Sequence, residues 1–377
     1  MSALTNEFTE ITETFARFSD EQIAPRAEAI DDAGEFPRDI FQQIGDLGFF
    51  GMRYPEAVGG LGLPFSAYCK AVEEIARGSL SVAACVSMQS LMGTNFVHAL
   101  GTEDHHERLL KPALRGEKIG TICITEPNAG TDLGSISTQA VEADGGYVLN
   151  GQKMWVTLAP LADFFTVFAR AGDEKKLTIF LVEKDFKGID VGRAIHKMGV
   201  RALPTSELAL SDCFVPAENR LGEIGAGEGE LRKILAQIRI MTGSLAVGVG
   251  RAAIRDATQY AMERKQFGKP IGKFQAIQMK IAEMATDLKA AGLLVDHALG
   301  LFDAGEPHHQ EAAMAKLFAT EAALSITDKC ARILASYGFA MEYPAQRHLR
   351  DIRFTLIGGG TSEILKLIIA HEETAKL

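Results

Sequence analysis

The sequence predicts an α+β protein in which a central β domain lies between two helical domains. Apolar residues recur every three or four positions along residues 1–120 and 223–377, but they gather in short β-rich runs along residues 121–222. The chain of 377 residues also exceeds the size at which one core usually stops growing. We therefore expect an N-terminal helical bundle, a mostly antiparallel sheet or barrel, and a C-terminal four-helix bundle.

The first 120 residues are predicted to be helical. Apolar residues repeat at helical spacing near the start of the chain, at Phe8, Ile11, Phe15 and Phe18. Pro37 is placed to open a helix that ends near Gly48, because proline is tolerated at a helix start and glycine favours its end. Two further apolar helices fit residues 65–78 and 81–100.

The middle domain is predicted from short runs of β-branched and aromatic residues. Its expected strands are residues 146–149, 164–168, 177–182 and 207–210. The dipeptides Gly145-Gly146, Asn150-Gly151 and Lys187-Gly188 are predicted to form turns between such strands.

The C-terminal domain is predicted to be a bundle of long helices. A glycine-rich linker at residues 225–229 precedes it. One helix has an apolar seam formed by Phe274, Ile277, Ile281, Met284 and Leu288. In another helix, the small residues along 242–250 predict a close approach of neighbouring helices, because missing side chains let backbones come together.

Composition excludes several classes of partner. The formal net charge is −10 and no basic stripe is present, so neither nucleic acid nor an anionic membrane is expected. The chain start lacks the features of a signal peptide and no run of about eighteen apolar residues occurs, which predicts a cytoplasmic protein. The five scattered cysteines are expected to be reduced core thiols. The histidine pairs 105–106 and 308–309 lack metal-ligand spacing and are expected at the surface, so no metal is predicted.

Two neighbouring segments have the residue types that a planar cofactor with polar edges requires. In Cys123–Asp132, small residues and hydroxyl groups share a turn, and Asn150–Thr157 contains the only tryptophan, Trp155. Free backbone amides in a turn can meet ring oxygen and nitrogen atoms, and an indole can cover a ring face. The two segments therefore predict a cofactor site.

Five ordered motifs resemble those of the acyl-CoA dehydrogenase family, over essentially the whole chain. They are T-E-P-x-A-G-[ST]-D (Thr125–Asp132), N-G-x-K-x-W-[IV]-T (Asn150–Thr157), R-x-x-F-G (Arg264–Gly268), E-Y-P-x-x-R-x-x-R-D (Glu342–Asp351) and G-T-x-E-I (Gly360–Ile364). The resemblance implies an FAD-dependent oxidoreductase, usually a homotetramer, that acts on the α and β carbons of an acyl thioester of CoA or of a carrier protein. Electron-transfer flavoprotein or another acceptor would receive the electrons.

The resemblance also implies which residues hold FAD. The matching positions are Ile124, Thr125, Gly130, Thr131, Trp155, Thr157, Arg264, Phe267, Gln275, Arg332, Thr361 and Glu363. Among them, Arg264, Phe267 and Gln275 would reach the cofactor of a neighbouring subunit. Arg332 stands where the family usually has glutamine. Thr361 follows three glycines and precedes an apolar helix, which also predicts a helix N-cap.

The catalytic base of the family is missing. Family members remove the α-proton of the thioester with a carboxylate at one of two positions, which are occupied here by Gly359 and Ile238. Neither residue can accept a proton. Glu126 is assigned a structural role, because its motif position is shared with members that have a normal base. The predicted substrate contacts are Thr131, Arg239 and the backbone N–H of Gly359.

Three functions remain open on the sequence alone. The first is dehydrogenation of an acyl thioester with a relocated or otherwise unusual base. The second is a flavin-dependent elimination from a substituted acyl-CoA, as in a desulfinase-like lyase, for which no α-proton has to be removed. The third is a non-catalytic FAD-binding protein. The motifs identify the cofactor better than the reaction.

Overall fold

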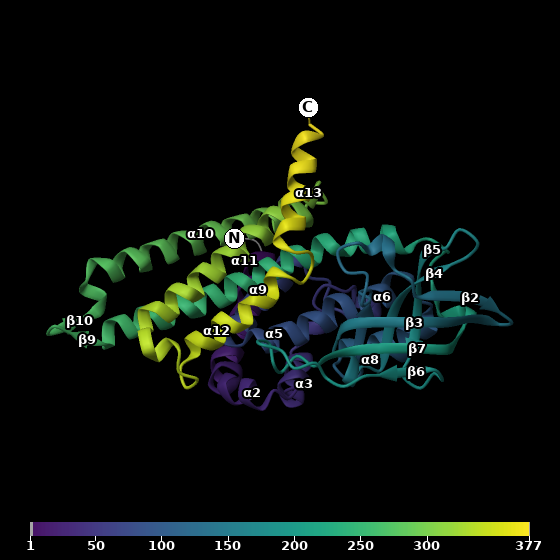
Figure 1. The fold of residues 1–377 in the computed structure, drawn as a ribbon, viewed down its shortest axis with the longest axis horizontal. Helices are drawn as coiled ribbons and strands as arrows, with labels where there is room; N and C mark the ends of the chain where they lie inside the picture. Colours follow the sequence, from purple (N-terminus) through teal and green to yellow (C-terminus); the bar gives the residue numbers. More distant parts are fainter. Residues whose placement is uncertain (1–2, 377) are drawn as a thin grey trace.

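A computed structural model describes residues 3–376 of the chain (Figure 1). Its N-terminal part is helical, as predicted, with α1 (Ala3–Phe18), α2 (Ala27–Ala33), α3 (Arg38–Asp46), α4 (Phe65–Gly78), α5 (Leu80–Ser87), α6 (Asn95–Leu100), α7 (Glu103–His105) and α8 (Lys111–Leu114). The helix α4 has the predicted bounds, and α3 follows Pro37 and ends just before Gly48. The seam predicted on α1 is partly buried, but its first residue, Phe8, lies outside the side chains that the structure describes.

The helix predicted over residues 81–100 is divided. A π-helical turn at Met88–Gly93 separates α5 from α6. The close approach of the neighbouring strand accounts for this break, because a Cβ at Gly93 would lie 2.2 Å from the carbonyl oxygen of Gly120. The stretch Leu80–Leu100 is long and apolar enough to cross a membrane, but 89% of its most apolar window is buried inside the protein.

The cysteines and two histidines, His105 and His348, lie inside the protein. All five cysteines are free and buried, as predicted. The prediction of surface histidines is wrong for His105, which is 1% exposed. Its burial is tolerated because both ring nitrogens have partners at 3.2 Å, the backbone N–H of Thr102 at the start of α7 and the side chain of Asn219. Among the described residues, no group of histidine, cysteine or acidic side chains is arranged to hold a metal.

The middle domain is one eight-stranded sheet. Its strands are β1 (Gly120–Cys123), β2 (Gln139–Ala143), β3 (Gly146–Thr157), β4 (Phe164–Ala171), β5 (Lys176–Glu183), β6 (Ile189–Val191), β7 (Thr205–Pro216) and β8 (Arg220–Leu221). Their order is β6-β7-β3-β2-β4-β5-β8, with β1 paired to β4. Most pairs are antiparallel, as predicted, but β4 runs parallel to β1 and to part of β2. Helices cover this part of the sheet, and β4 and β5 are buried along nearly their whole lengths.

The turn predicted at Asn150-Gly151 is instead a bulge inside β3. The pairing of β3 with β7 shifts register between Leu149 and Gly151, and the strand then continues to Thr157. The Asn150 side chain bonds both the backbone N–H and the carboxylate of Asp212 on β7, which stabilises the irregularity. The Asn-Gly dipeptide alone therefore favours a turn, but hydrogen bonds to the neighbouring strand keep this segment in the sheet as a bulge.

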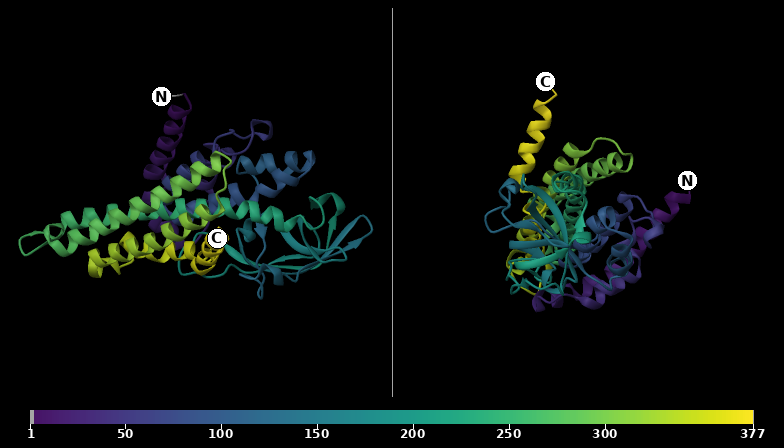
Figure 2. Two further views of the ribbon diagram at one scale, coloured as in Figure 1. Left: turned by 90° about the horizontal axis from the view of Figure 1, so that it is seen from above. Right: turned by 90° about the vertical axis from the view of Figure 1, so that its right-hand side faces the viewer.

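The C-terminal part consists mainly of long helices that lie side by side in Figure 1. Its elements are α9 (Gly227–Glu263), β9 (Lys265–Gln266), β10 (Lys269–Pro270), α10 (Gln275–Asp303), α11 (His309–Leu334), α12 (Pro344–Ile352) and α13 (Ser362–Thr374). The helix α9 begins inside the stretch predicted as a linker, at residues 225–229. Figure 2 shows α13 projecting away from the other helices. The predicted domain boundaries, after residues 120 and 222, remain predictions.

Glycines place α9 directly against its neighbours, as its small residues predict. A Cβ at Gly248 would lie 2.3 Å from the carbonyl oxygen of Glu73 on α4, and a Cβ at Gly243 would lie 2.8 Å from Val295 on α10. Substitution at either position would push the helices apart. The close packing of α9 on both sides fixes the position of the residues that α9 contributes to the site.

Candidate functional site

The first cofactor motif forms a tight turn after β1. The backbone groups of Glu126 and Ala129 exchange two hydrogen bonds, of 2.9 and 3.2 Å, which close the turn. Gly130 and Thr131 follow it and are exposed. No heavy atom lies within 4 Å of the position that a Cβ would take at Gly130, so a ligand can approach the backbone there.

The carboxylate of Glu126 stabilises this turn through hydrogen bonds to neighbouring segments. It accepts five hydrogen bonds of 2.5–2.9 Å, from the backbone N–H and hydroxyl groups of Ser137 and Thr138 and from the ammonium group of Lys153. Both members of the Glu126–Lys153 ion pair are buried. Glu126 therefore has the structural role predicted for it, because its carboxylate is fully occupied.

Stability at low pH is expected to depend on Glu126. Burial alone would raise the pKa of this carboxyl group, but hydrogen bonds from Lys153, Thr138 and Ser137 outweigh burial and lower the pKa to about 2. The unfolded chain, with an ordinary pKa of 4.5, takes up the proton first as the pH falls. The stabilising contribution is therefore complete above about pH 4.5 and is lost toward about pH 2. Acid unfolding of the wild type should show this fall in the free energy of unfolding, and Glu126→Gln should show a smaller fall over the same pH range. The same pH dependence in both proteins would contradict the expectation.

The second cofactor motif lies beside the first. The backbone N–H of Met154 donates to the carbonyl oxygen of Thr125 at 2.8 Å, and Lys153 donates to the carbonyl oxygen of Ile124 at 3.1 Å. Trp155 has a left-handed backbone, with φ of 59°, where the register between β3 and β7 shifts a second time. This conformation leaves the indole 55% exposed, whereas Thr157 is buried. An exposed indole beside an open glycine and a free hydroxyl group fits a planar, polar-edged cofactor such as FAD.

The two positions where the family places its base meet in space. Gly359 precedes α13 and has a left-handed backbone, with φ of 73°. A Cβ there would lie 3.0 Å from Cγ2 of Ile238 on α9 and 3.8 Å from the hydroxyl oxygen of Thr242. The structure thus brings both predicted positions to one place, and that place has no carboxylate from either of them.

Two buried cations lie beside this place. Arg239 follows Ile238 on α9 and is 9% exposed, and burial lowers its pKa. Lys316 on α11 is fully buried and donates a 2.6 Å hydrogen bond to the carbonyl oxygen of Gly360. Burial, and then the charge of Arg239, lower the pKa of Lys316 to about 8. No sequence motif includes Lys316, and a lone lysine on an alanine-rich helix is usually solvated, so no local signal indicated its burial.

The residues at the start of α13 have the predicted local structure. The hydroxyl oxygen of Thr361 accepts a 3.4 Å hydrogen bond from the backbone N–H of Ile364, so Thr361 is the predicted N-cap. Glu363 is exposed in the first turn. The hydroxyl group of Ser362 donates to the exposed carboxylate of Glu321 at 2.6 Å. Neither carboxylate belongs to the buried surface around Gly359.

Four of the predicted FAD contacts lie elsewhere in the subunit. Arg264, Phe267 and Gln275 are at or beside the β9–β10 hairpin, which Figure 1 shows at the end of the molecule opposite the sheet. Phe267 is 92% exposed at the hairpin tip. Arg332 lies in the last turn of α11 and pairs with Asp328 at 2.6 Å. One subunit therefore does not bring these residues to Trp155.

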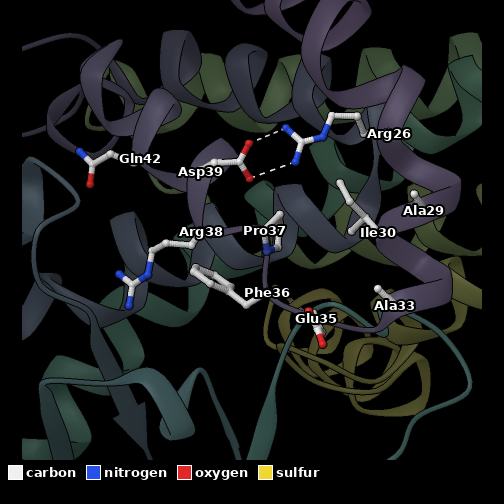
Figure 3. Close-up of a pocket in the computed structure, with 10 residues that line it drawn as sticks. All are labelled: Arg26, Ala29, Ile30, Ala33, Glu35, Phe36, Pro37, Arg38, Asp39 and Gln42. Carbon is white, nitrogen blue, oxygen red and sulfur yellow. Dashed lines mark hydrogen bonds and ion pairs between the residues drawn. The ribbon is translucent and has the colours of Figure 1, made fainter.

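A shallow pocket of 670 Å³ lies away from all of these residues (Figure 3). It is lined by α2, α3 and the segment between them, including Ile30, Phe36 and Pro37. The guanidinium group of Arg26 and the carboxylate of Asp39 meet across it, at 2.5 and 3.0 Å. Because its charged groups neutralise each other, and none of the predicted site residues lines it, this pocket is not the candidate site.

Comparison with known proteins agrees with the fold and with the motifs. The chain matches the models of the acyl-CoA dehydrogenase N-terminal domain over residues 5–117, the middle domain over 121–213 and the C-terminal domain over 225–373. It is 67% identical over 370 residues to the benzylmalonyl-CoA dehydrogenase of Aromatoleum aromaticum, with 98% of each chain covered.

Solved structures give the same result. The butyryl-CoA dehydrogenase of Megasphaera elsdenii has a TM-score of 0.93 and 34% identity, with 99% of each chain covered. The structure of PigA with FAD and proline has a TM-score of 0.95 and 26% identity, and it covers 100% of this chain and 99% of that one. Members of this family depend on FAD. The chain therefore belongs to the acyl-CoA dehydrogenase family of oxidoreductases.

Proposed function

We propose that this protein oxidises the α and β carbons of a CoA thioester that carries a carboxylate on its α carbon, and that loss of CO2 replaces removal of the α-proton. The observation that carries the proposal is the meeting of Gly359 and Ile238, neither of which has a carboxylate: a Cβ added at Gly359 would lie 3.0 Å from Cγ2 of Ile238. The buried charges beside them, on Arg239 and Lys316, are both positive. The region around Gly359 and Ile238 therefore suits an anionic substrate, and neither of these residues supplies a carboxylate base.

The substrate class follows from the same chemistry. The relative from Aromatoleum aromaticum is named for benzylmalonyl-CoA, a thioester with a carboxylate on the α carbon and an arylmethyl group. For this chain we infer an arylmethyl-malonyl thioester of CoA rather than of a carrier protein. The electron pair of the bond between the α carbon and the carboxylate becomes the α,β double bond, and the carboxylate leaves as CO2. Charge and atoms balance without a proton acceptor.

The FAD that this reaction requires has a fitting site. When bound, FAD accepts the hydride from the β carbon. Gly130 and Thr131 present an open backbone and a hydroxyl group to it, and Trp155 offers an exposed indole. The backbone N–H of Gly359 would polarise the thioester carbonyl in the proposed arrangement. Electron-transfer flavoprotein, or another acceptor, remains the predicted recipient of the electrons.

We infer that the protein assembles as a homo-oligomer, in keeping with the predicted cytoplasmic homotetramer. Large apolar side chains are exposed on the helices and loops of the C-terminal part, among them Phe267 at 92%, Phe339 at 90% and Ile357 at 69%. Exposed aromatic residues of this size are typical of surfaces that a partner covers. A neighbouring copy would also bring Arg264 and Gln275 to the cofactor.

Release of CO2 by the purified holoenzyme tests the proposed function. Benzylmalonyl-CoA labelled in the α-carboxylate, mixed anaerobically with the protein, is expected to bleach the flavin and to yield labelled CO2 and 3-phenylpropenoyl-CoA in equal amounts. The matched thioester without the carboxylate, 3-phenylpropanoyl-CoA, is expected to leave the flavin oxidised. Comparable bleaching by the second thioester would favour a relocated base, and a saturated product without bleaching would favour elimination. No reaction with either, although FAD is bound, would favour a non-catalytic protein.

A further inference from the structure

The side chain of Arg239 is largely buried and has no counter-ion in the part of the chain that the structure describes. The side chain is 9% exposed, and its Nε atom is fully buried and has no hydrogen-bond partner among residues 3–376. Within that same range, no carboxylate forms an ion pair with it. A buried charge without a partner is strongly destabilising, so its presence needs an explanation.

Another arginine of the same helix shows how such a charge is usually satisfied. Arg251, on α9, contacts the buried carboxylates of Glu73 and Glu74 at 2.8 and 2.5 Å. Glu321 on α11 and Glu363 on α13 act on the neighbouring Lys316, but both are exposed and neither forms an ion pair with Arg239. Among residues 3–376, buried carboxylates therefore pair with Arg251 but not with Arg239.

The position of Arg239 matches the place where the substrate would react. Its charge acts on Lys316, which donates to the carbonyl oxygen of Gly360, and it directly follows Ile238, whose Cγ2 would lie 3.0 Å from a Cβ at Gly359. The hydroxyl group of Thr242 donates to the carbonyl oxygen of Ile238 at 2.7 Å, so it does not compete for an anion. Lys316 already donates to the carbonyl oxygen of Gly360, and it holds the turn that contains Gly359. Among the described residues, the guanidinium group of Arg239 is thus a donor without a partner beside this turn.

We propose that Arg239 binds the α-carboxylate of the substrate and selects 2-carboxyacyl thioesters over thioesters that lack this group. This assignment rests on the proposed function, and it names the residue that recognises the departing group. A planar guanidinium group matches a carboxylate with two parallel hydrogen bonds. Ile238 presents an apolar surface beside it, which suits the neutral CO2 that forms. Lys316 acts as a positioning residue for the Gly359–Gly360 turn.

The test compares binding of two thioesters that do not react. Phenylmalonyl-CoA carries the α-carboxylate but has no transferable hydrogen on a β carbon, and phenylacetyl-CoA is its match without the carboxylate. By calorimetry, the wild-type holoenzyme should bind the first at least about tenfold more tightly, as expected for charge-assisted hydrogen bonds to a buried donor. In Arg239→Gln this preference should fall to about one while the Kd for phenylacetyl-CoA stays within about twofold. Arg239→Lys should recover part of the preference.

The control is Arg232→Gln, which removes an exposed arginine from the same helix and should leave the preference unchanged. Equal weakening of both ligands in Arg239→Gln would show a structural role and overturn the assignment. An unchanged preference, or a wild-type protein without any preference, would overturn it as well. These binding experiments test the role of Arg239 alone. The proposed function is tested separately, by release of labelled CO2 from benzylmalonyl-CoA.

Discussion

Ile238→Glu is expected to turn the protein into a dehydrogenase that removes an α-proton. Ile238 is 6% exposed and faces Gly359, so a carboxylate there would lie where the family has its base. General-base catalysis contributes roughly 100-fold or more to rate. Oxidation of 3-phenylpropanoyl-CoA, followed as anaerobic flavin bleaching, should therefore rise at least about 100-fold over the wild type. CO2 release from benzylmalonyl-CoA should fall by a similar factor, because the new carboxylate repels that of the substrate.

The matched control is Ile238→Gln, which has the same shape and no charge. It should not gain oxidation of 3-phenylpropanoyl-CoA. If Ile238→Glu retains FAD and binds the thioester but gains nothing over this control, the pocket does not place the substrate between Gly359 and Ile238. Gly359→Glu should gain less, because the left-handed backbone disfavours a side chain and the new Cβ would crowd Ile238.

Lys153→Met is expected to lower the apparent free energy of unfolding by about 3–5 kcal/mol, because it leaves the buried carboxylate of Glu126 without its counter-charge. The change also removes the bond from Lys153 to the carbonyl oxygen of Ile124. Both effects loosen the turn before Gly130, so FAD should be lost during purification more readily than from the wild type. Denaturant unfolding and the ratio of flavin to protein absorbance measure the two effects.

Lys176→Met provides the comparison for this buried pair. Lys176 contacts Glu174 at 2.6 Å, but both side chains are more than half exposed. Exposed ion pairs of this kind contribute little to stability, because solvent screens the charges. A loss of stability in Lys153→Met no larger than in Lys176→Met would mean that the Glu126 network does not hold the cofactor turn.

Local sequence signals predicted most elements but failed where distant segments decide the conformation. The helix α4 begins after a proline and has a regular apolar pattern, so its bounds were readable. The break after α5 depends on β1 passing close to Gly93, and the continuity of β3 through Asn150-Gly151 depends on Asp212. Neither contact has a local signature, since each joins residues far apart in the sequence.

The site was predictable to the extent that motifs define it. The motifs located the two residues, Gly359 and Ile238, that take the place of a base. That the two meet, and that Arg239 lacks a counter-ion, depends on how α9 packs against the turn before α13. Lys316 was missed because a single lysine on an alanine-rich helix is usually solvated, and only the fold shows it bonded to Gly360.

The place of the β9–β10 hairpin has a genetic consequence. It lies at the end of the molecule opposite the sheet, which contains the strand that precedes the cofactor turn (Figure 1). If the hairpin contributes residues to the FAD site of a neighbouring subunit, a mutation in the hairpin leaves the site of its own subunit intact and inactivates that of the neighbour. In mixed oligomers, a defective hairpin on one copy and a defective pocket on another would then restore some complete sites, so two inactive alleles would complement each other.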